Sequence, residues 1–135
     1  MKIVNFVICD TTEINSNGVP VIVNPFQLIA FESFPNRYTF TISFGVFDFP
    51  LEGASLMVKL ISPEGDIVAS TNGINFAPQF SKETDESRKT GAQLNLEYRN
   101  VVFKNPGEYK VELWLDDRKY REEVLEVVSN DRADA

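Results

Sequence analysis

The chain has 135 residues, of which 43% are hydrophobic and 24% charged, a composition that fits one globular domain and excludes a disordered chain. Its net charge of -7 at pH 7 disfavours binding to nucleic acids or anionic membranes, because both need clustered basic residues. No window approaches the roughly 18 apolar residues that cross a bilayer, and a single cysteine excludes an intrachain disulfide.

The first predicted element is a strand over residues 3–9, an apolar-rich segment interrupted by Asn5. It lacks the uninterrupted apolar stretch and the small-residue cleavage site of a secretory signal, so we expect a cytoplasmic location. Cys9 ends this strand. Its apolar setting predicts a buried thiol with a raised pKa and little reactivity.

The next segment, "CDTTE" (residues 9–13), resembles the Asp-Thr-Gly of aspartic proteases, whose chemistry needs two carboxylates that share a proton. Thr12 stands where that motif has its turn glycine, and no partner motif appears later in the chain. We therefore interpret Asp10 as a residue that caps the turn after the first strand.

Two prolines interrupt residues 19–31, which contain one or two further strands. Because proline cannot donate to a β-ladder, Pro20 and Pro25 predict an edge strand or a kinked crossing. The strand over residues 37–46 alternates apolar with small polar residues, which indicates one buried face. Two more strands, residues 56–61 and 66–70, are joined by the turn "SPEG".

Residues 71–91 are polar and charged and predict a long exposed loop, with one helical turn near residues 82–89 as the alternative for part of it. A strand follows over residues 93–98, in which apolar and polar residues again alternate. The last hairpin begins at Tyr109, reverses at Asp116 and Asp117, and continues to Val127.

In the first strand of this hairpin every second residue from Tyr109 onwards is apolar and is predicted to face the core. Trp114 lies on the opposite face and is predicted to point outward, where a tryptophan is typical of an interface anchor. The basic residues at 118–121 are flanked by acids on both sides, so we interpret them as charge-balanced and solvated. Residues 129–135 are interpreted as a frayed tail.

These elements amount to about seven to nine short strands separated by turn signals, without a helix-length insert. Such spacing predicts an all-β fold, either a sandwich or a barrel, and the one-sided apolar runs favour an antiparallel sandwich. We expect one domain over residues 1–128.

The segment "FKNPGEYKVELWL" (residues 103–115) resembles the entry to the penultimate strand of immunoglobulin-like and fibronectin-type-III-like sandwiches. In those folds a tyrosine hydroxyl binds the upstream backbone and forms a tyrosine corner. The resemblance implies that Tyr109 takes this role over the turn that begins at Asn105.

A second resemblance covers nearly the whole chain and concerns a family of short bacterial proteins known only as a domain of unknown function. Four pieces carry it: "ICDTTEINSNG" (8–18), "ESFP" (32–35), "VKLISPEGDIV" (58–68) and "VVFKNPGEYKVELWLDDRKYREEVLEV" (101–127). It implies a single immunoglobulin-like sandwich and no chemistry. Where that family would continue directly with "NGK", this chain has "NGVPVIVNP", which leaves the second strand open.

The chain contains no histidine, so the usual general base near neutral pH and the commonest metal ligand are both missing. We therefore expect neither an enzyme nor a bound cofactor or metal. Calcium at paired acids in turns, such as Glu64 with Asp66 or Asp116 with Asp117, is a weak alternative, since such acids are usually solvated turn formers.

The first functional hypothesis is a non-catalytic interaction or assembly module, which pairs its edge strands with a protein partner or with itself. Trp114 is then a candidate interface residue. The alternative is a module that binds a small ligand or carbohydrate through the aromatic residues Phe47 and Phe49 and the loop at 71–91. Both hypotheses exclude nucleic acid and membrane as partners.

Overall fold

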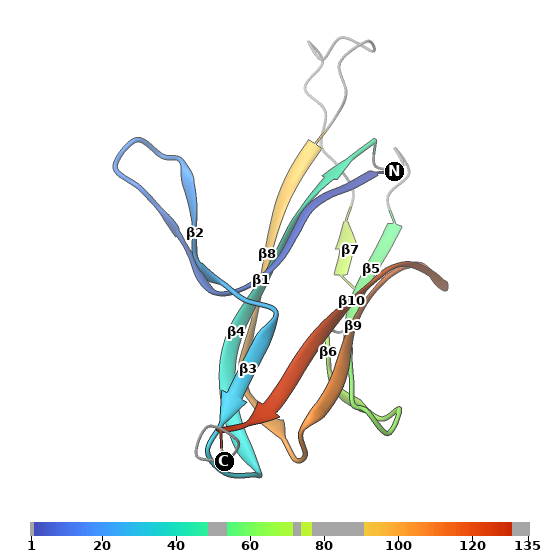
Figure 1. Ribbon diagram of the computed structural model, residues 1–135. Coiled ribbons are helices and arrows are strands. Elements are labelled where there is room, and N and C mark those ends of the chain that lie inside the picture. The colour runs from blue at the N-terminus through green and yellow to red at the C-terminus, as the bar shows by residue number, and fades with distance from the viewer. Residues whose placement is uncertain (1, 49–53, 72–73, 77–90, 131–135) are drawn as a thin grey trace, which may run out of the picture.

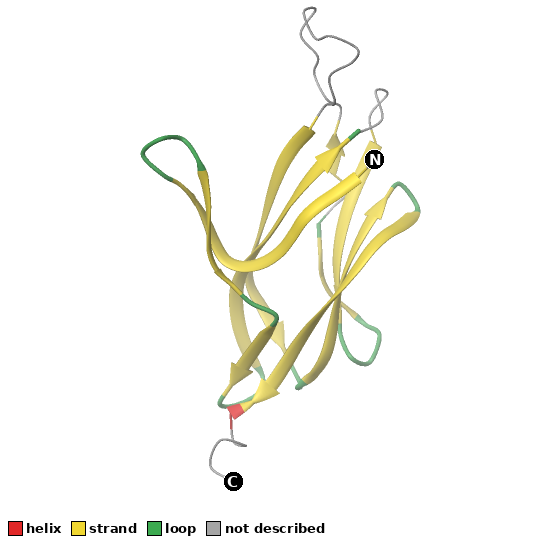
Figure 2. Ribbon diagram, turned by 45° about the horizontal axis from the view of Figure 1, so that its top comes forward, coloured by secondary structure: helices red, strands yellow, loops and turns green. Residues whose placement is uncertain are grey.

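The computed structural model describes residues 2–48, 54–71, 74–76 and 91–130 of the chain (Figure 1). In these residues the fold is all-β, with ten strands in two sheets and no α-helix (Figure 2). The all-β prediction is therefore confirmed. The strand count is higher than expected because a short strand lies inside the predicted loop.

One sheet, called sheet A, has four antiparallel strands in the order β2-β1-β4-β8. Their bounds are β1 (Lys2–Ile14), β2 (Pro20–Pro25), β4 (Asn36–Phe47) and β8 (Gly91–Phe103). β2 is an edge strand, as its two prolines predict.

The other sheet, called sheet B, has the order β3-β10-β9-β5-β6, and β7 also pairs with β5. Its strands are β3 (Leu28–Phe31), β5 (Ala54–Ile61), β6 (Ile67–Ser70), β7 (Ile74–Phe76), β9 (Gly107–Leu115) and β10 (Arg118–Ser129). All pairings are antiparallel except that of β3 with β10. The chain therefore changes sheet between β2 and β3, directly after Pro25.

The core lies between the two sheets and follows the period-two alternation of the strands. From sheet A, β4 supplies the buried residues Phe40, Ile42, Phe44 and Val46. From sheet B, β5 and β9 supply Leu56, Val58, Leu60, Tyr109, Val111 and Leu113. The core is rich in aromatic contacts, in keeping with the eleven phenylalanines of the chain.

Two tyrosine hydroxyls form hydrogen bonds to backbone carbonyls at one side of the core. The Tyr109 hydroxyl donates to the carbonyl of Asn105 at 2.8 Å, the contact that defines a tyrosine corner. The Tyr98 hydroxyl on β8 donates to the carbonyl of Val58 on β5 at 3.0 Å and so joins sheet A to sheet B. β6 contacts β8 on this same side.

The structure corrects three boundaries. β7 lies within the stretch expected to be a loop, although residues 72–73 and 77–90, which include the alternative helical turn, lie outside the described residues. β10 continues to Ser129, which was assigned to the frayed tail. β1 continues to Ile14, because Thr11 to Ile14 pair with β2, so Asp10 is a strand residue and the interpretation of it as a turn cap is wrong.

Candidate functional site

The side of the molecule opposite the tyrosine contacts is open. β1 pairs with β2 only from Cys9 onwards, and β10 pairs with β3 only from Glu126 onwards. The earlier halves of both strands, residues 2–7 and 118–125, are paired on one side and have no described strand on the other. Two free strand edges, one from each sheet, therefore border the same opening (Figure 1).

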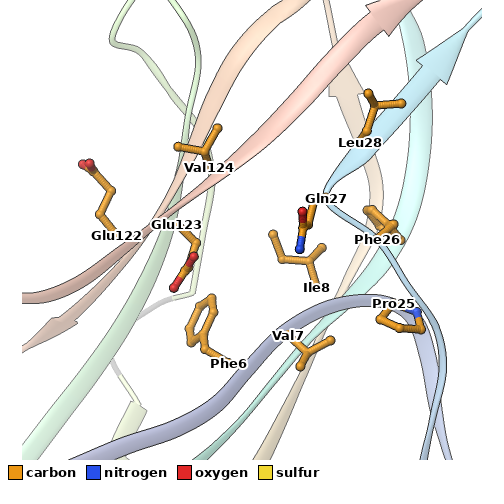
Figure 3. Close-up of a pocket in the computed structure, with 10 residues that line it drawn as sticks. All are labelled: Phe6, Val7, Ile8, Pro25, Phe26, Gln27, Leu28, Glu122, Glu123 and Val124. Atoms are coloured by element: carbon orange, nitrogen blue, oxygen red, sulfur yellow. The ribbon is translucent and has the colours of Figure 1, made fainter.

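A cleft with a volume of about 920 Å³ occupies this opening (Figure 3). Three segments line it: β1, the crossing between β2 and β3, and β10. The lining residues are Phe6, Val7, Ile8, Pro25, Phe26, Gln27, Leu28, Glu122, Glu123 and Val124. Most of them are apolar, and the polar ones are one amide and two carboxylates.

Phe6 forms the β1 wall of the cleft. Its ring stacks on the buried Phe44, with ring centroids 5.5 Å apart. The ladder between β1 and β4 shifts register between Val4 and Val7, and Asn5 adopts a positive φ of 51° within this irregularity. Asparagine tolerates this conformation better than most residues, and such a bulge re-aims the side chains that follow it.

The β10 wall carries an ion pair that points inward. Arg121 and Glu123 precede the buried Leu125 by four and two residues, so all three lie on the same face of β10. The Arg121 Nε lies 2.7 Å from a carboxylate oxygen of Glu123, and the guanidinium carbon lies 5.6 Å from the Phe6 ring centroid. Inward charges on an edge strand are a known protection against uncontrolled strand pairing.

The crossing from sheet A to sheet B forms one end of the cleft. The Phe26 N–H donates to the carbonyl of Ile8 in sheet A at 2.9 Å. The next residue, Gln27, accepts at its carbonyl from the N–H of Glu126 in sheet B, also at 2.9 Å. Two neighbouring residues are thus each bonded to a different sheet, which fixes this end of the cleft.

A polar cluster adjoins the crossing. The carboxylate of Asp10 accepts hydrogen bonds from the Tyr38 hydroxyl and, at 2.6 Å, from the Asn24 side-chain amide. Tyr38 also packs edge-on against Phe26, with ring centroids 5.8 Å apart. Burial, the hydrogen bond to Asp10 and the charge of Asp10 together raise the pKa of Tyr38 from 10.0 to about 12.

This shift predicts a loss of stability at high pH. The Tyr38 phenol of the unfolded chain ionises near pH 10, whereas that of the folded chain stays protonated until about pH 12. The unfolded state therefore loses its proton first in this window, and the free energy of unfolding falls as pH rises through it. In the Tyr38→Phe variant we expect a shallower fall, measured by urea denaturation at successive pH values.

The matched control for this experiment is Tyr120→Phe, because Tyr120 is exposed on β10. It should leave the fall unchanged. A Tyr38→Phe curve that runs parallel to that of the parent chain between pH 10 and 12 would contradict the prediction.

The residues predicted as interface candidates lie away from the cleft. Trp114 lies half-buried on the outer face of sheet B, as its alternation with the core residues predicts. Its indole N–H donates to Glu112 at 3.0 Å, and the Lys59 ammonium lies 4.5 Å from its ring centroid. Phe47 is exposed at the end of β4, and Phe49 lies outside the described residues. The interface role of Trp114 stays a prediction.

Cys9 is fully buried beside β4, where its thiol lies 3.6 Å from the carbonyl of Thr41. Burial, with a smaller contribution from the charge of Asp10, raises the pKa of the thiol, so both the burial and the direction of the shift are confirmed. Of the paired acids considered for calcium, Asp116 binds the backbone of Ser55 instead. Within the described ranges, no group of three or more Cys, Asp or Glu could hold a metal ion.

Sequence reasoning missed the residues that shape the cleft, above all Phe6, Phe26, Arg121 and Glu123. One signal was present: the two charged residues stand at the positions that continue the inward row of Leu125 and Val127. Charges in an inward row indicate that the strand edge there is open to water.

The fold and the cleft together define a class: an all-β protein of two facing sheets, with an open side bordered by two free strand edges. Comparison with known proteins assigns the chain to a family. Residues 4–128 match the family of unknown function DUF6941, and the chain belongs to this family. No curated protein and no solved structure matches the chain. The search for a helix long and apolar enough to span a membrane found none in the described residues.

Proposed function

We propose that this protein is a non-catalytic, cytoplasmic interaction module that binds an extended strand of a partner protein in the cleft between β1 and β10. The observation that carries the proposal is the pair of free strand edges, which belong to different sheets and face one opening. An added strand gains main-chain hydrogen bonds from such an edge, and pockets between the sheets select its alternate side chains.

The direction of the main-chain groups supports this use of β10. The Glu126 N–H points toward β3, where it binds Gln27. Because main-chain groups alternate along a strand, the N–H and carbonyl groups of Glu122 and Val124 point to the same side. No described strand occupies that side. These groups would receive the partner strand in line with β3.

The fold itself is best interpreted as an immunoglobulin-like sandwich, and three features support this. The order β1-β4-β8 corresponds to strands A, B and E of that fold, and β5-β9-β10 corresponds to C, F and G. Tyr109 forms a tyrosine corner with Asn105 at the start of the strand that corresponds to F. In this interpretation the open side lies between strands A and G.

The experiment is a selection from a phage-displayed library of random short peptides, followed by titration of the enriched peptide. Val124→Pro removes one of the free N–H donors of the cleft edge, and we expect it to weaken peptide binding by about tenfold or more. Val124→Thr keeps the donor and the β-branched shape and serves as the matched control. Failure to enrich any peptide, or equal binding by both variants, would overturn the proposal.

A further inference from the structure

The hairpin formed by the end of β1 and by β2 projects beyond the other strands of sheet A and away from sheet B, and residues 11–24 of this hairpin are called the arm (Figures 1 and 2). Its ladder pairs Thr11 with Val23, Thr12 with Ile22, Glu13 with Val21 and Ile14 with Pro20. β2 is the edge of sheet A, and no described strand pairs with its outer side. An isolated two-stranded ribbon is at best marginally stable in water, so this length of unsupported hairpin is unusual.

The arm is apolar although it is exposed. It carries four of the ten exposed large hydrophobic residues of the described chain, namely Ile14, Val19, Val21 and Ile22. Ile14 is 74% exposed and Val19 is 52% exposed. Apolar residues gathered in this way on a soluble surface indicate contact with another molecule.

The arm is also preorganised at both ends. At the tip, the Asn15 side chain accepts hydrogen bonds from the N–H groups of Asn17 and Val19, each at 2.9 Å, and Gly18 takes the positive φ that the turn requires. At the base, Asn24 is bound to Asp10. A segment held in this way loses little conformational freedom when it binds, which favours association.

We propose that the arm joins two copies of this chain, with β2 of one copy paired antiparallel to β2 of the other across a two-fold axis. The charge distribution is compatible with a second copy as the occupant. Each chain carries a net charge of -7, so most approaches bring like charges together, but the arm holds a single charged residue, Glu13. β2 itself holds none, and two acidic chains can meet there without repulsion across the contact.

The backbone of β2 fixes the register of this pairing. The N–H of Asn15 donates to the carbonyl of Val19 at 3.0 Å, so Val19, and by alternation Val21 and Val23, direct their main-chain groups toward β1. Ile22 directs its main-chain groups toward the free edge, and Pro20 its carbonyl, and the regular alternation ends at Asn24, which has a φ of 53°. An antiparallel pair centred on Ile22 therefore sets Ile22 opposite Ile22 of the second copy.

In that register Pro20, which has no N–H, falls opposite Asn24 at the two ends of the pairing, where a missing donor costs least. Each β2 edge is used once, so the contact closes as a dimer and does not extend into a filament. The two copies of sheet A would form one continuous sheet. This inference does not rest on the cleft, which lies at other residues.

The first test is the mass of the full chain in solution, measured by light scattering over a concentration series. We expect twice the mass of one chain, and Ile22→Lys should raise the dissociation constant at least about tenfold, because it sets two ammonium groups opposite each other. Ile67→Lys, at another exposed isoleucine, should leave the dimer intact. A monomer at every concentration, or equal effects of the two variants, would overturn the proposal.

The second test fixes the register by cross-linking. Residues opposite each other in a hydrogen-bonded antiparallel pair have Cα atoms about 5.5 Å apart, within the range of a disulfide. Under mild oxidation Ile22→Cys should therefore give a covalent dimer, while Val21→Cys should give far less. The two native residues are almost equally exposed, at 38% and 39%, so accessibility is matched. Equal yields from both variants would overturn the register and with it the two-fold pairing.

Discussion

Replacement of Phe103 by alanine is expected to lower the free energy of unfolding by about 3–5 kcal/mol, the usual cost of removing a buried phenylalanine ring. Phe103 is fully buried at the end of β8. Its ring centroid lies 5.6 Å from that of Phe31, 6.4 Å from that of Phe40 and 5.1 Å from that of Tyr109. These rings come from both sheets, so a cavity at this position weakens the contact between the sheets.

Urea denaturation followed by the fluorescence of Trp114, the one tryptophan of the chain, measures this loss. Val102→Ala is the matched control, because Val102 is the preceding residue on β8 and is 37% exposed. We expect it to change the free energy of unfolding by about 0.5 kcal/mol or less. Similar losses in the two variants would show that Phe103 is not central to the core.

The second large effect is expected at Gly107, where replacement by alanine should cost about 2 kcal/mol or more. Gly107 has a φ of +145°, a conformation that side chains with a Cβ rarely adopt and that costs about 1–3 kcal/mol. A Cβ at this position would also lie 2.6 Å from the Pro63 Cγ, which belongs to a stiff ring in the turn between β5 and β6. Backbone strain and overlap therefore add.

A double-mutant cycle separates the two causes. Combination of Gly107→Ala with Pro63→Ala removes the Pro63 Cγ, which would lie 2.6 Å from the added Cβ, and leaves only the Cβ of residue 63, at 3.1 Å. The combination should therefore recover part of the loss, while the backbone strain remains. Gly65→Ala provides the control for strain alone, because Gly65 has a φ of +92° but nothing within 4 Å of the added Cβ. If Gly107→Ala costs no more than Gly65→Ala, contact with Pro63 does not contribute.

The period-two pattern predicts the core well because the core strands are buried on one face. In β9 the row that begins at Tyr109 is buried as expected, and Trp114 lies on the other face. The prolines of β2 predict its place at the sheet edge, since a missing donor is tolerated only there.

The β1 half of the arm and β7 could not be predicted by the same pattern. Residues 11–14 of the arm are exposed or half-buried on both faces, so no alternation marks them as a strand, and the first strand was predicted to end at Cys9. β7 has only three residues and lies in a polar stretch, below the length at which alternation becomes visible.

The cleft depends on where pairing stops, which no local pattern encodes. β2 and β3 leave β1 and β10 at Cys9 and Glu126, and these positions are set by the crossing of the chain from one sheet to the other. The inward positions of Arg121 and Glu123 are the one local feature of the sequence that reflects where the pairing of β10 with β3 stops. They become interpretable only when the register of β10 against β9 is known.

The crossing at Phe26 and Gln27 has a mechanical consequence for the cleft. Because these neighbours bond to opposite sheets, only two residues, from the N–H of Phe26 to the carbonyl of Gln27, span the gap at that point. The sheets cannot separate there without the loss of a hydrogen bond, so the distance between them is fixed at the crossing. Any widening of the cleft must therefore increase with distance from the crossing. A guest strand would therefore enter from the end of the cleft remote from the crossing and advance toward a fixed stop.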